Sequence, residues 1–312
     1  MYQQISSNKR KSLLLLGGFI LLYAGIGWLL SLWFGDAAFF IALGIAVMMV
    51  IVNLYMGDDL VLAVSGARKV ESKDEAPELW RKVENLAITA GLPMPRLYIV
   101  PDDTPNAFAA GRKPEQAIVA VTSGLLERLD EEELEGVLAH EMSHIRNYDV
   151  RLMTYAAVLA GSIAMISQIF LRGMMFGGGR RDERGGANPI VLVAVLAALI
   201  LAPIAAIVIQ TAISRRREYV ADASAVELTR YPQGLASALR QISENRKPSE
   251  RLSNQAIAHM MIAQPLSATG RVSRLFATHP PIEDRIARLE TMAAGQAHHH
   301  GLPTETRRAA AP

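Results

Sequence analysis

Uncharged hydrophobic stretches alternate with polar, charged segments along this chain of 312 residues. Four stretches contain no Asp, Glu, Lys or Arg, and they cover residues 12–34, 37–56, 152–171 and 189–213. Each reaches about 20 residues, the length that an α-helix needs to cross the hydrocarbon core of a bilayer. The pattern therefore predicts about four transmembrane helices. Four buried helices of a soluble core are the alternative, although such helices normally keep a polar face.

Basic residues next to these stretches predict an orientation. Lys9, Arg10 and Lys11 precede the first stretch, and Arg215–Arg217 follow the last. Because cytoplasmic loops are enriched in Lys and Arg, both ends of the helical set are expected in the cytoplasm. The loop 176–186 between the third and fourth stretches also holds three arginines. Positive charges outside the cytoplasm argue against two full crossings there, so a re-entrant pair or a peripheral hairpin remains open.

The segment 57–151 is polar and carries signals for a small folded domain. Residues 77–90 have the apolar spacing of an amphipathic helix, and RLYIV, AFAAG and AIVAV are strand-like runs separated by turn residues. A further helix begins after Asp130, with Glu133 three residues on, which is the pattern of a capping box. The region 214–292 is expected to complete this domain, with helices that have polar faces over residues 219–290. The tail 293–312, rich in Ala, His and Arg, is predicted to be disordered.

Composition narrows the possible functions. Hydrophobic residues make up 51% of the chain, which favours a membrane protein, with the lipid bilayer as a partner. A formal net charge of +2 gives no case for nucleic-acid binding. The chain has no cysteine, which excludes disulfides, thiolate metal ligands and a cysteine nucleophile.

The clearest chemical signal is LAHEMSHIRNYD, at residues 138–149. His140 and His144 are four residues apart, so on a helix they lie on one face, about 40° apart around the axis. Two imidazoles on one face suit zinc, and Glu141 lies where a carboxylate can act on a water molecule at the metal. This is the H-E-x-x-H arrangement of zinc-dependent proteases. A helix with two solvated histidines is the alternative.

A catalytic zinc takes three protein ligands, and without cysteine the third must be His, Asp or Glu. The best candidate is Glu218 in SRRREYVADASA, at the end of the last hydrophobic stretch. Asp222 lies four residues later on the same helical face, where it can orient a ligand imidazole. His140 and Glu218 are separated by two crossings or by none, so both lie on one side of the membrane. Ordinary solvated acids are the alternative.

Three segments in this order, HEMSHIRNYD, SRRREYVADASA and LFATHPPIEDRIARLE, resemble the HtpX-type membrane zinc metalloproteases, relatives of the CAAX prenyl protease family. The resemblance covers most of the chain. It implies an α+β, mainly helical membrane protein with a zincin-like catalytic domain and a small sheet. It also implies one Zn²⁺ per chain, held by His140, His144 and Glu218, with Glu141 as general base and Asp222 supporting a ligand.

The resemblance extends to PNAFAAGR, at residues 105–112, which is similar to the strand next to the active site in that family. It implies that a substrate backbone pairs with this edge. The contacts implied are Asn106, Ala107, Phe108 and Ala109. A plain edge strand is an equally open interpretation.

Three other polar residues receive weaker interpretations. His279 in THPP resembles a family histidine near the zinc and could stabilise the oxyanion, while a histidine at a helix start is the alternative. Asp149, five residues after His144, is expected to serve structure. His259 in AIAHMMIA is expected to be packed rather than catalytic.

These observations predict a membrane-bound zinc endopeptidase whose partners are polypeptides. The resemblance implies quality control of misfolded or damaged membrane proteins, on the cytoplasmic side of a plasma membrane, as in the bacterial inner membrane. A non-enzymatic, zinc-stabilised membrane scaffold is the alternative, but a purely structural site needs no base such as Glu141. A transporter is disfavoured because no predicted span carries Asp, Glu, Lys or Arg.

Overall fold

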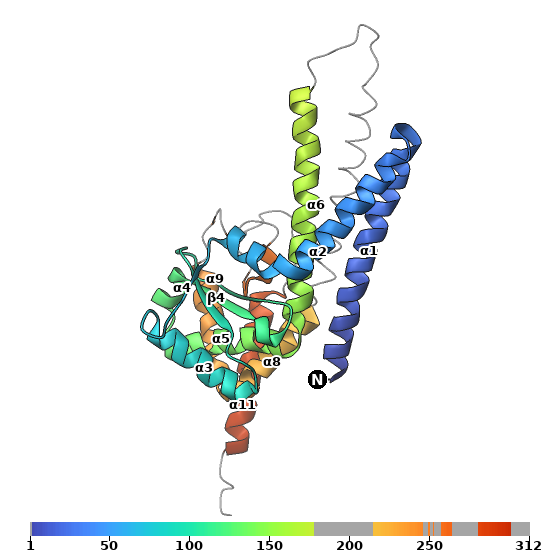
Figure 1. Cartoon of the computed structure of the whole chain (residues 1–312). Helices are drawn as coiled ribbons and strands as arrows, with labels where there is room; N and C mark the ends of the chain where they lie inside the picture. Colours follow the sequence, from blue (N-terminus) through green and yellow to red (C-terminus); the bar gives the residue numbers. More distant parts are fainter. Residues whose placement is uncertain are drawn as a thin grey trace, which may run out of the picture.

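The computed structural model describes residues 2–177, 215–245, 257–263 and 280–300, together with Ser249 and Leu252. Two long helices, α1 (Tyr2–Phe34) and α2 (Ala37–Ser65), form an antiparallel hairpin beside a compact body that holds the sheet (Figure 1). The chain reverses at Gly35, whose φ of 78° is readily adopted only by glycine. The third long helix, α6 (Asp149–Gly177), packs against both members of the hairpin.

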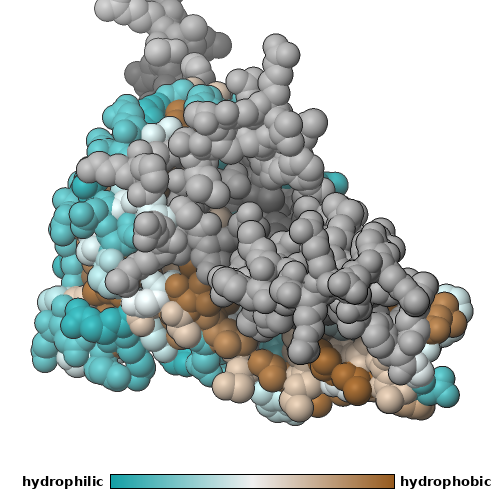
Figure 2. Space-filling view, turned by 90° about the horizontal axis from the view of Figure 1, so that it is seen from above, coloured by the Kyte–Doolittle hydropathy of each residue, from teal (hydrophilic) through white to brown (hydrophobic). Residues whose placement is uncertain are grey.

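The outer surface of the hairpin is apolar. Among the described residues, every exposed large hydrophobic side chain except Ile88 and Tyr231 lies on α1 or α2. The view from above shows brown, hydrophobic residues toward the hairpin and teal, hydrophilic ones over the body (Figure 2). Both helices contain a segment long and apolar enough to cross a membrane, Ile5–Trp28 in α1 and Ala37–Ser65 in α2.

The second helix does not end near Gly57, where the sequence suggested a return to a polar segment. It continues for two more turns to Ser65 and ends at Gly66, which caps it in the left-handed conformation with φ 65°. The extension carries the buried Asp58, whose carboxylate lies 2.9 Å from Nη2 of Arg96. This helix is therefore joined directly to the sheet by an ion pair, which the uncharged stretch alone could not indicate.

Of the third and fourth predicted spans, the structure describes only the third. Residues 152–171 lie within α6, and its first half is buried between the hairpin and the body. The stretch 189–213 and most of the arginine-containing loop before it lie outside the described residues. The structure therefore supports a mainly helical protein with two candidate membrane helices, and four crossings remain a prediction.

The three predicted strands and a short fourth one form a small mixed sheet in the order β1-β2-β4-β3. β2 (Arg96–Val100) and β4 (Ile118–Thr122) are parallel, while β3 (Ala107–Ala110) is antiparallel to β4 and forms one edge. The two-residue β1 (Arg68–Lys69) forms the other edge. Every residue of β3 and β4 is buried, because helices and loops cover both faces.

Helix α5 (Glu131–Arg146) lies beside β3 at the centre of the body. The predicted capping box is present, since Asp130 accepts from the backbone of Glu133 and the Glu133 side chain accepts in return. α5 crosses α9 (Pro232–Glu244) where Gly136 faces Leu235, and a Cβ at Gly136 would lie 2.6 Å from the Leu235 nitrogen. Only glycine allows this close crossing, which fixes α5 in the core.

The remaining helices surround α5. α3 (Pro77–Ala90), predicted with these bounds, packs on one side, and α8 (Arg215–Thr229) and α9 pack on another. α11 (Ile282–His300) packs against α8 and α9 and continues as a helix past residue 293, into the segment expected to be a disordered tail. Short helices complete the described chain: α4 (Ser123–Arg128), η1 (Pro114–Gln116) and η2 (Ala258–Met260).

Candidate metal centre

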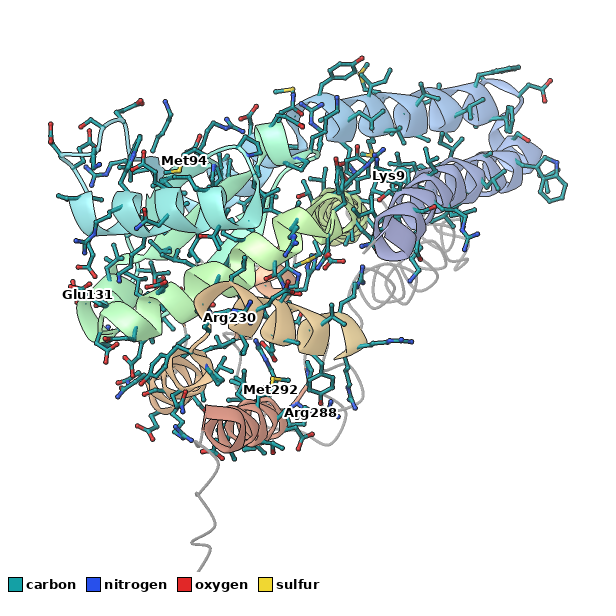
Figure 3. The ribbon with its side chains drawn as sticks, turned by 90° about the horizontal axis from the view of Figure 1, so that it is seen from below. Lys9, Met94, Glu131, Arg230, Arg288 and Met292 are labelled. Carbon is teal, nitrogen blue, oxygen red and sulfur yellow. The ribbon has the colours of Figure 1, made fainter. Side chains whose placement is uncertain are left out.

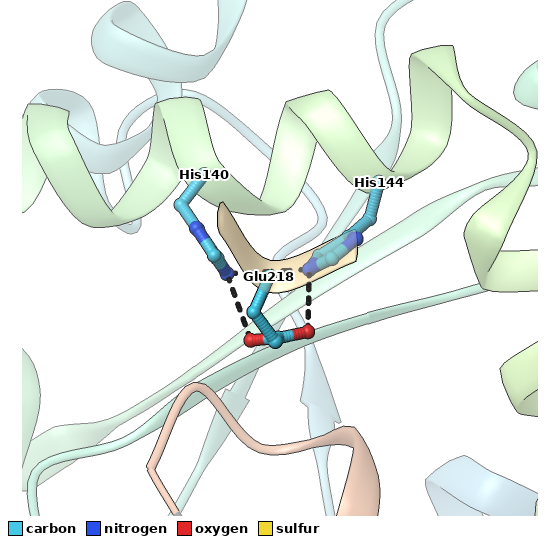
Figure 4. Close-up of side chains that lie close together, drawn as sticks. All are labelled: His140, His144 and Glu218. Atoms are coloured by element: carbon cyan, nitrogen blue, oxygen red, sulfur yellow. Dashed lines mark hydrogen bonds and ion pairs between the residues drawn. The ribbon is translucent and has the colours of Figure 1, made fainter. Parts of the chain in front are cut away.

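Three buried side chains converge between α5 and α8. His140 and His144 project from one face of α5, and Glu218 reaches them from the first turn of α8 (Figure 4). The two Nε2 atoms lie 3.2 Å apart, and the Glu218 oxygens lie 3.7 Å from Nε2 of His140 and 3.6 Å from Nε2 of His144. All three residues are at most 3% exposed. The structure thus brings together the three predicted ligands, from segments 74 residues or more apart in sequence.

The spacing of the donor atoms fits one metal ion. Tetrahedral ligands at about 2.0–2.2 Å from a zinc ion lie about 3.3–3.6 Å from one another. The three ligand atoms lie within 4.8 Å of one another and offer two imidazole nitrogens and one carboxylate oxygen. Among the described residues no fourth ligand joins this donor set, and a site with three protein ligands and one open position is typical of catalytic zinc.

His140 is oriented by a carboxylate that is itself held by an arginine. Its Nδ1 lies 2.9 Å from Oδ1 of Asp222, the residue predicted to support a ligand. The fully buried Arg285 of α11 donates from Nε and Nη2 to the two Asp222 oxygens, at 2.9 and 2.7 Å. Burial lowers the pKa of His140 and outweighs the opposing effect of Asp222, so its imidazole is neutral and able to bind a cation.

His144 has a matching partner in Asp149. Its Nδ1 lies 3.2 Å from Oδ2 of Asp149, the first residue of α6. Asp149 was expected to serve structure, and the structure places it in contact with the imidazole of a predicted ligand. Burial alone lowers the pKa of His144, but the hydrogen bond to Asp149 and the charge of Glu218 prevail and raise it to about 9. In the metal-free protein this imidazole therefore keeps a proton that a metal ion must displace.

Glu141 lies next to the ligand set and is 1% exposed. Burial raises the pKa of its carboxyl to about 7, and the nearby charge of Glu218 acts in the same direction. The opposite, smaller effects come from His144, Arg285 and a backbone hydrogen bond from Ala109. A carboxyl whose pKa is near neutral can both take and return a proton at physiological pH. Glu141 therefore has the environment that a general base needs.

The predicted substrate strand is an edge strand, but its outer edge already carries hydrogen bonds. Ile262 donates from its backbone nitrogen to the Ala107 oxygen at 2.9 Å. The Asn106 side chain donates to the Ala263 oxygen at 2.8 Å and faces the Ala263 nitrogen at 3.4 Å. Ala109 directs its N–H to Glu141. The segment 262–263 of the chain itself thus lies on the edge where a substrate was expected.

Of the two remaining predicted histidines, the structure describes only His259. His279 lies outside the described residues, so its role near the metal stays a prediction. His259 is buried in η2 with Nε2 3.4 Å from the Met153 oxygen, and its predicted packing role stays a prediction. Arg285 was missed by the sequence reasoning, although it lies in the segment LFATHPPIEDRIARLE. A buried arginine cannot be recognised until its carboxylate partner is known.

Two histidines and a glutamate around one point, with a second glutamate beside them, define the class of HExxH metalloproteases. The comparison with protein families agrees. Residues 73–293 match the model of peptidase family M48, and this chain belongs to that family. It is a metalloprotease, which decides against the scaffold alternative.

Relatives in bacteria match over nearly the whole chain. A protein named protease HtpX homolog from Ligilactobacillus salivarius is 47% identical over 303 residues, covering 94% of this chain and 100% of its own. One from Tropheryma whipplei is 46% identical over 292 residues, covering 94% of this chain and 98% of its own. Among solved structures, Ste24p of S. mikatae matches with a TM-score of 0.48 and 17% identity, covering 93% of this chain and 67% of that one.

Proposed function

We propose that this metalloprotease is a zinc-dependent endopeptidase that cleaves misfolded or damaged polypeptides at the cytoplasmic surface of a bacterial inner membrane. The observation that carries the proposal is the convergence of His140, His144 and Glu218 on one point, with the buried Glu141 next to them. A purely structural site would fill its fourth position with another protein ligand, and among the described residues no fourth ligand joins this group.

Zinc is the ion that this donor set favours. Two neutral imidazoles and one carboxylate form a ligand set found in zinc peptidases, whereas calcium and magnesium prefer oxygen ligands alone. A zinc ion bound here supplies a Lewis acid that polarises a carbonyl and lowers the pKa of water toward about 7. Asp222 and Asp149 each fix one imidazole by its Nδ1, which leaves Nε2 of both rings for the metal.

Glu141 supplies the proton transfer. With a pKa raised to about 7 by burial, its carboxylate can accept a proton from water as water attacks the peptide carbonyl. The same carboxyl can then give that proton to the departing amine. His279, if it reaches the site, is proposed to stabilise the negative charge on the carbonyl oxygen.

A substrate backbone is proposed to bind along β3, in contact with Asn106, Ala107, Phe108 and Ala109. Strand addition uses backbone hydrogen bonds, so it accepts many sequences and suits unfolded segments. The outward groups of Ala107 and Ala109 bind Ile262 and Glu141 in this structure. A substrate that pairs with β3 therefore has to take the place of residues 262–263.

The membrane location rests on the hairpin of α1 and α2 and on the basic residues beside it. The apolar outer surface of the hairpin fits the bilayer interior, and Lys9–Lys11 lie at the end nearer the metal centre. This arrangement would hold the centre on the cytoplasmic side. Proteolysis there suits the removal of misassembled membrane proteins. A multi-pass topology with four crossings is part of the proposal.

Metal removal and restoration test the proposed activity. The protein is purified in detergent with a chelator, divided, and incubated with zinc, magnesium or buffer before digestion of casein is followed. We expect zinc alone to restore cleavage, with Glu141→Gln inactive under the same conditions. Cleavage that is as fast without zinc as with it, or that Glu141→Gln retains, would overturn the proposed chemistry.

A further inference from the structure

A buried asparagine in the first helix reaches the metal centre. Asn8 is 4% exposed and lies on α1, one turn before the uncharged stretch begins. Asparagine is a poor helix former, so its burial inside a helix calls for a specific partner. Its Nδ2 donates to the Asn147 oxygen at 3.0 Å and to Oδ1 of Asp149 at 2.7 Å. Both hydrogens of the amide are therefore used, on partners about 140 residues away.

Asp149 connects this helix to a metal ligand. One of its oxygens accepts from Asn8, and the other lies 3.2 Å from Nδ1 of His144. Asp149 is 3% exposed, and Nη1 of Arg217, next to Glu218 in sequence, lies 3.8 Å from the oxygen that Asn8 binds. One carboxylate is thus shared by α1, the ligand on α5 and the start of α8.

The backbone around Asp149 is also held by α1. Tyr148 joins α5 to α6 with a φ of 59°, a left-handed conformation that is uncommon for a residue with a bulky side chain. Lys9 places its Nζ 4.6 Å from the centre of the Tyr148 ring. The view from below shows Lys9 near the start of α1, beside the end of α6 at which that helix begins (Figure 3). Neighbouring residues of α1 therefore contact both Tyr148 and Asp149.

From this arrangement we infer that Asn8 is a positioning residue of the protease, which makes the first helix part of the metal centre. By fixing Oδ1 of Asp149, Asn8 keeps Oδ2 directed at Nδ1 of His144. That hydrogen bond sets the tautomer and the plane of the imidazole, so Nε2 faces the metal. The inference rests on the proposed metal binding, and it assigns α1 a role beyond attachment to a membrane.

A purely structural role for Asn8 makes a different prediction, and the chain offers a matched control. Asn53 of α2 is also fully buried, and its Nδ2 donates to the Tyr155 oxygen of α6 at 3.1 Å. It also donates from a buried amide of the hairpin to α6, but it binds a backbone oxygen, and within the described residues no hydrogen bond joins Tyr155 to His140, His144 or Glu218. Loss of either asparagine should reduce stability, and only loss of Asn8 should weaken metal binding.

The test measures zinc affinity of the metal-free full-length protein in detergent, by competition with a chromophoric chelator. Removing a residue that directly orients a ligand costs about 10- to 100-fold in metal affinity, and Asn8 acts one contact further away. We therefore expect about a tenfold loss in Asn8→Ala and none in Asn53→Ala. Asn8→Leu and Asn53→Leu, which keep a side chain branched at Cγ, replace this pair if the alanine variants do not fold.

A double variant decides whether Asn8 acts through Asp149. Above pH 9, where protons no longer compete with zinc for His144, Asp149→Asn alone should lower zinc affinity more than Asn8→Ala, and adding Asn8→Ala to it should cause no further loss. Parental affinity in Asn8→Ala, an equal loss in Asn53→Ala, or additive losses in the double variant would each overturn the inference. If the parent itself binds no zinc, or His144→Ala binds it as tightly, the proposed function fails first.

Discussion

Arg285 holds both oxygens of Asp222, and Asp222 in turn holds the ligand His140. The same guanidinium donates from Nη1 to the Ile262 oxygen at 3.0 Å. Ile262 is the residue whose backbone nitrogen bonds to Ala107 on the edge strand. One arginine therefore supports a metal ligand and the segment that lies on the proposed substrate edge.

Replacing Arg285 with alanine should destabilise the protein strongly. The change leaves the buried carboxylate of Asp222 without its cation, and breaking a buried ion pair in this way costs about 3–5 kcal/mol. Arg285→Lys should recover only part of this, because lysine cannot bind both oxygens with a planar fork. Thermal unfolding of the metal-free variants measures the effect. Arg288→Ala is the control on the same helix, because Arg288 is exposed and, among the described residues, stacks only on the Tyr219 ring, so its loss should cost no more than about 1 kcal/mol.

Variants of Glu218 and Glu141 should both lose activity, but for different reasons. Glu218→Ala removes one of three ligands, so it should lose stoichiometric zinc together with activity. Glu141→Gln keeps both imidazoles and the shape of the pocket, so it should retain zinc while its rate falls by at least about 10²- to 10⁴-fold. Metal analysis and casein digestion on both variants distinguish these outcomes. Tight zinc in Glu218→Ala would place the third ligand elsewhere, and normal cleavage by Glu141→Gln would refute the HExxH assignment.

Metal affinity should rise with pH. The pKa of His144 is raised from 6.5 to about 9, so its proton stabilises the metal-free fold below pH 6.5 and this contribution is lost as the pH rises through about 9. Glu141, raised to about 7 by burial, changes stability in the same direction between its ordinary pKa and about 7.

Because zinc must displace the His144 proton, affinity should increase up to tenfold per pH unit between about 6.5 and 9. Chelator competition at several pH values measures this increase, and thermal unfolding of the metal-free protein should show stability falling over the same range. In Asp149→Asn the increase should move to lower pH, because the neutral amide no longer raises the pKa of His144. A flat affinity profile in the parent would contradict the prediction.

The topology can be tested with reporter fusions. Joint binding of one metal ion requires that residues 57–151 and the region after Ser214 lie on one side of the membrane. Fusions after Gly66, where α2 ends, and after Ser224 should therefore report the same, cytoplasmic side. Opposite sides would exclude the shared centre. A fusion after Gly177, at the end of α6, tests separately whether α6 crosses the bilayer.

Asn106 should affect substrate binding more than the chemical step. Its amide binds the backbone of Ala263 on the edge that a substrate is proposed to use. Asn106→Ala should change KM by several-fold and leave zinc content unchanged, since Asn106 does not contact the ligands. Peptide cleavage kinetics with parallel metal analysis provide the measurement, with the exposed Asn85 on α3 as a control position. An unchanged KM would remove Asn106 from the proposed substrate site.

Local patterns predicted much of the fold and the three side chains that converge between α5 and α8. The capping box at Asp130, the helix at residues 77–90 and the H-E-x-x-H spacing depend on residues within a few turns of one another, so sequence alone could indicate them. Glu218 could be identified because cysteine is missing and membrane topology limits the choice.

Long-range polar contacts could not be predicted in this way. Asn8 is 141 residues from Asp149, and Arg285 is 63 residues from Asp222, so no periodicity links the partners. The end of α2 was also misplaced, because Gly57 was read as the start of a polar segment. Within the structure Asp58 continues the helix, since Arg96 of the neighbouring strand neutralises it.

Asn8 and His144 are linked through a single residue, Asp149, so the distance between the first helix and the proposed cleavage site is fixed. Asn8 lies one turn, about 6 Å along the helix axis, before Ser12, where the uncharged stretch begins. With α1 across the bilayer as we propose, the metal stays at a constant distance from the lipid surface. Cuts in a membrane-protein substrate should then cluster in a narrow band beside its own membrane boundary, and loops too short to reach that band should survive whatever their sequence.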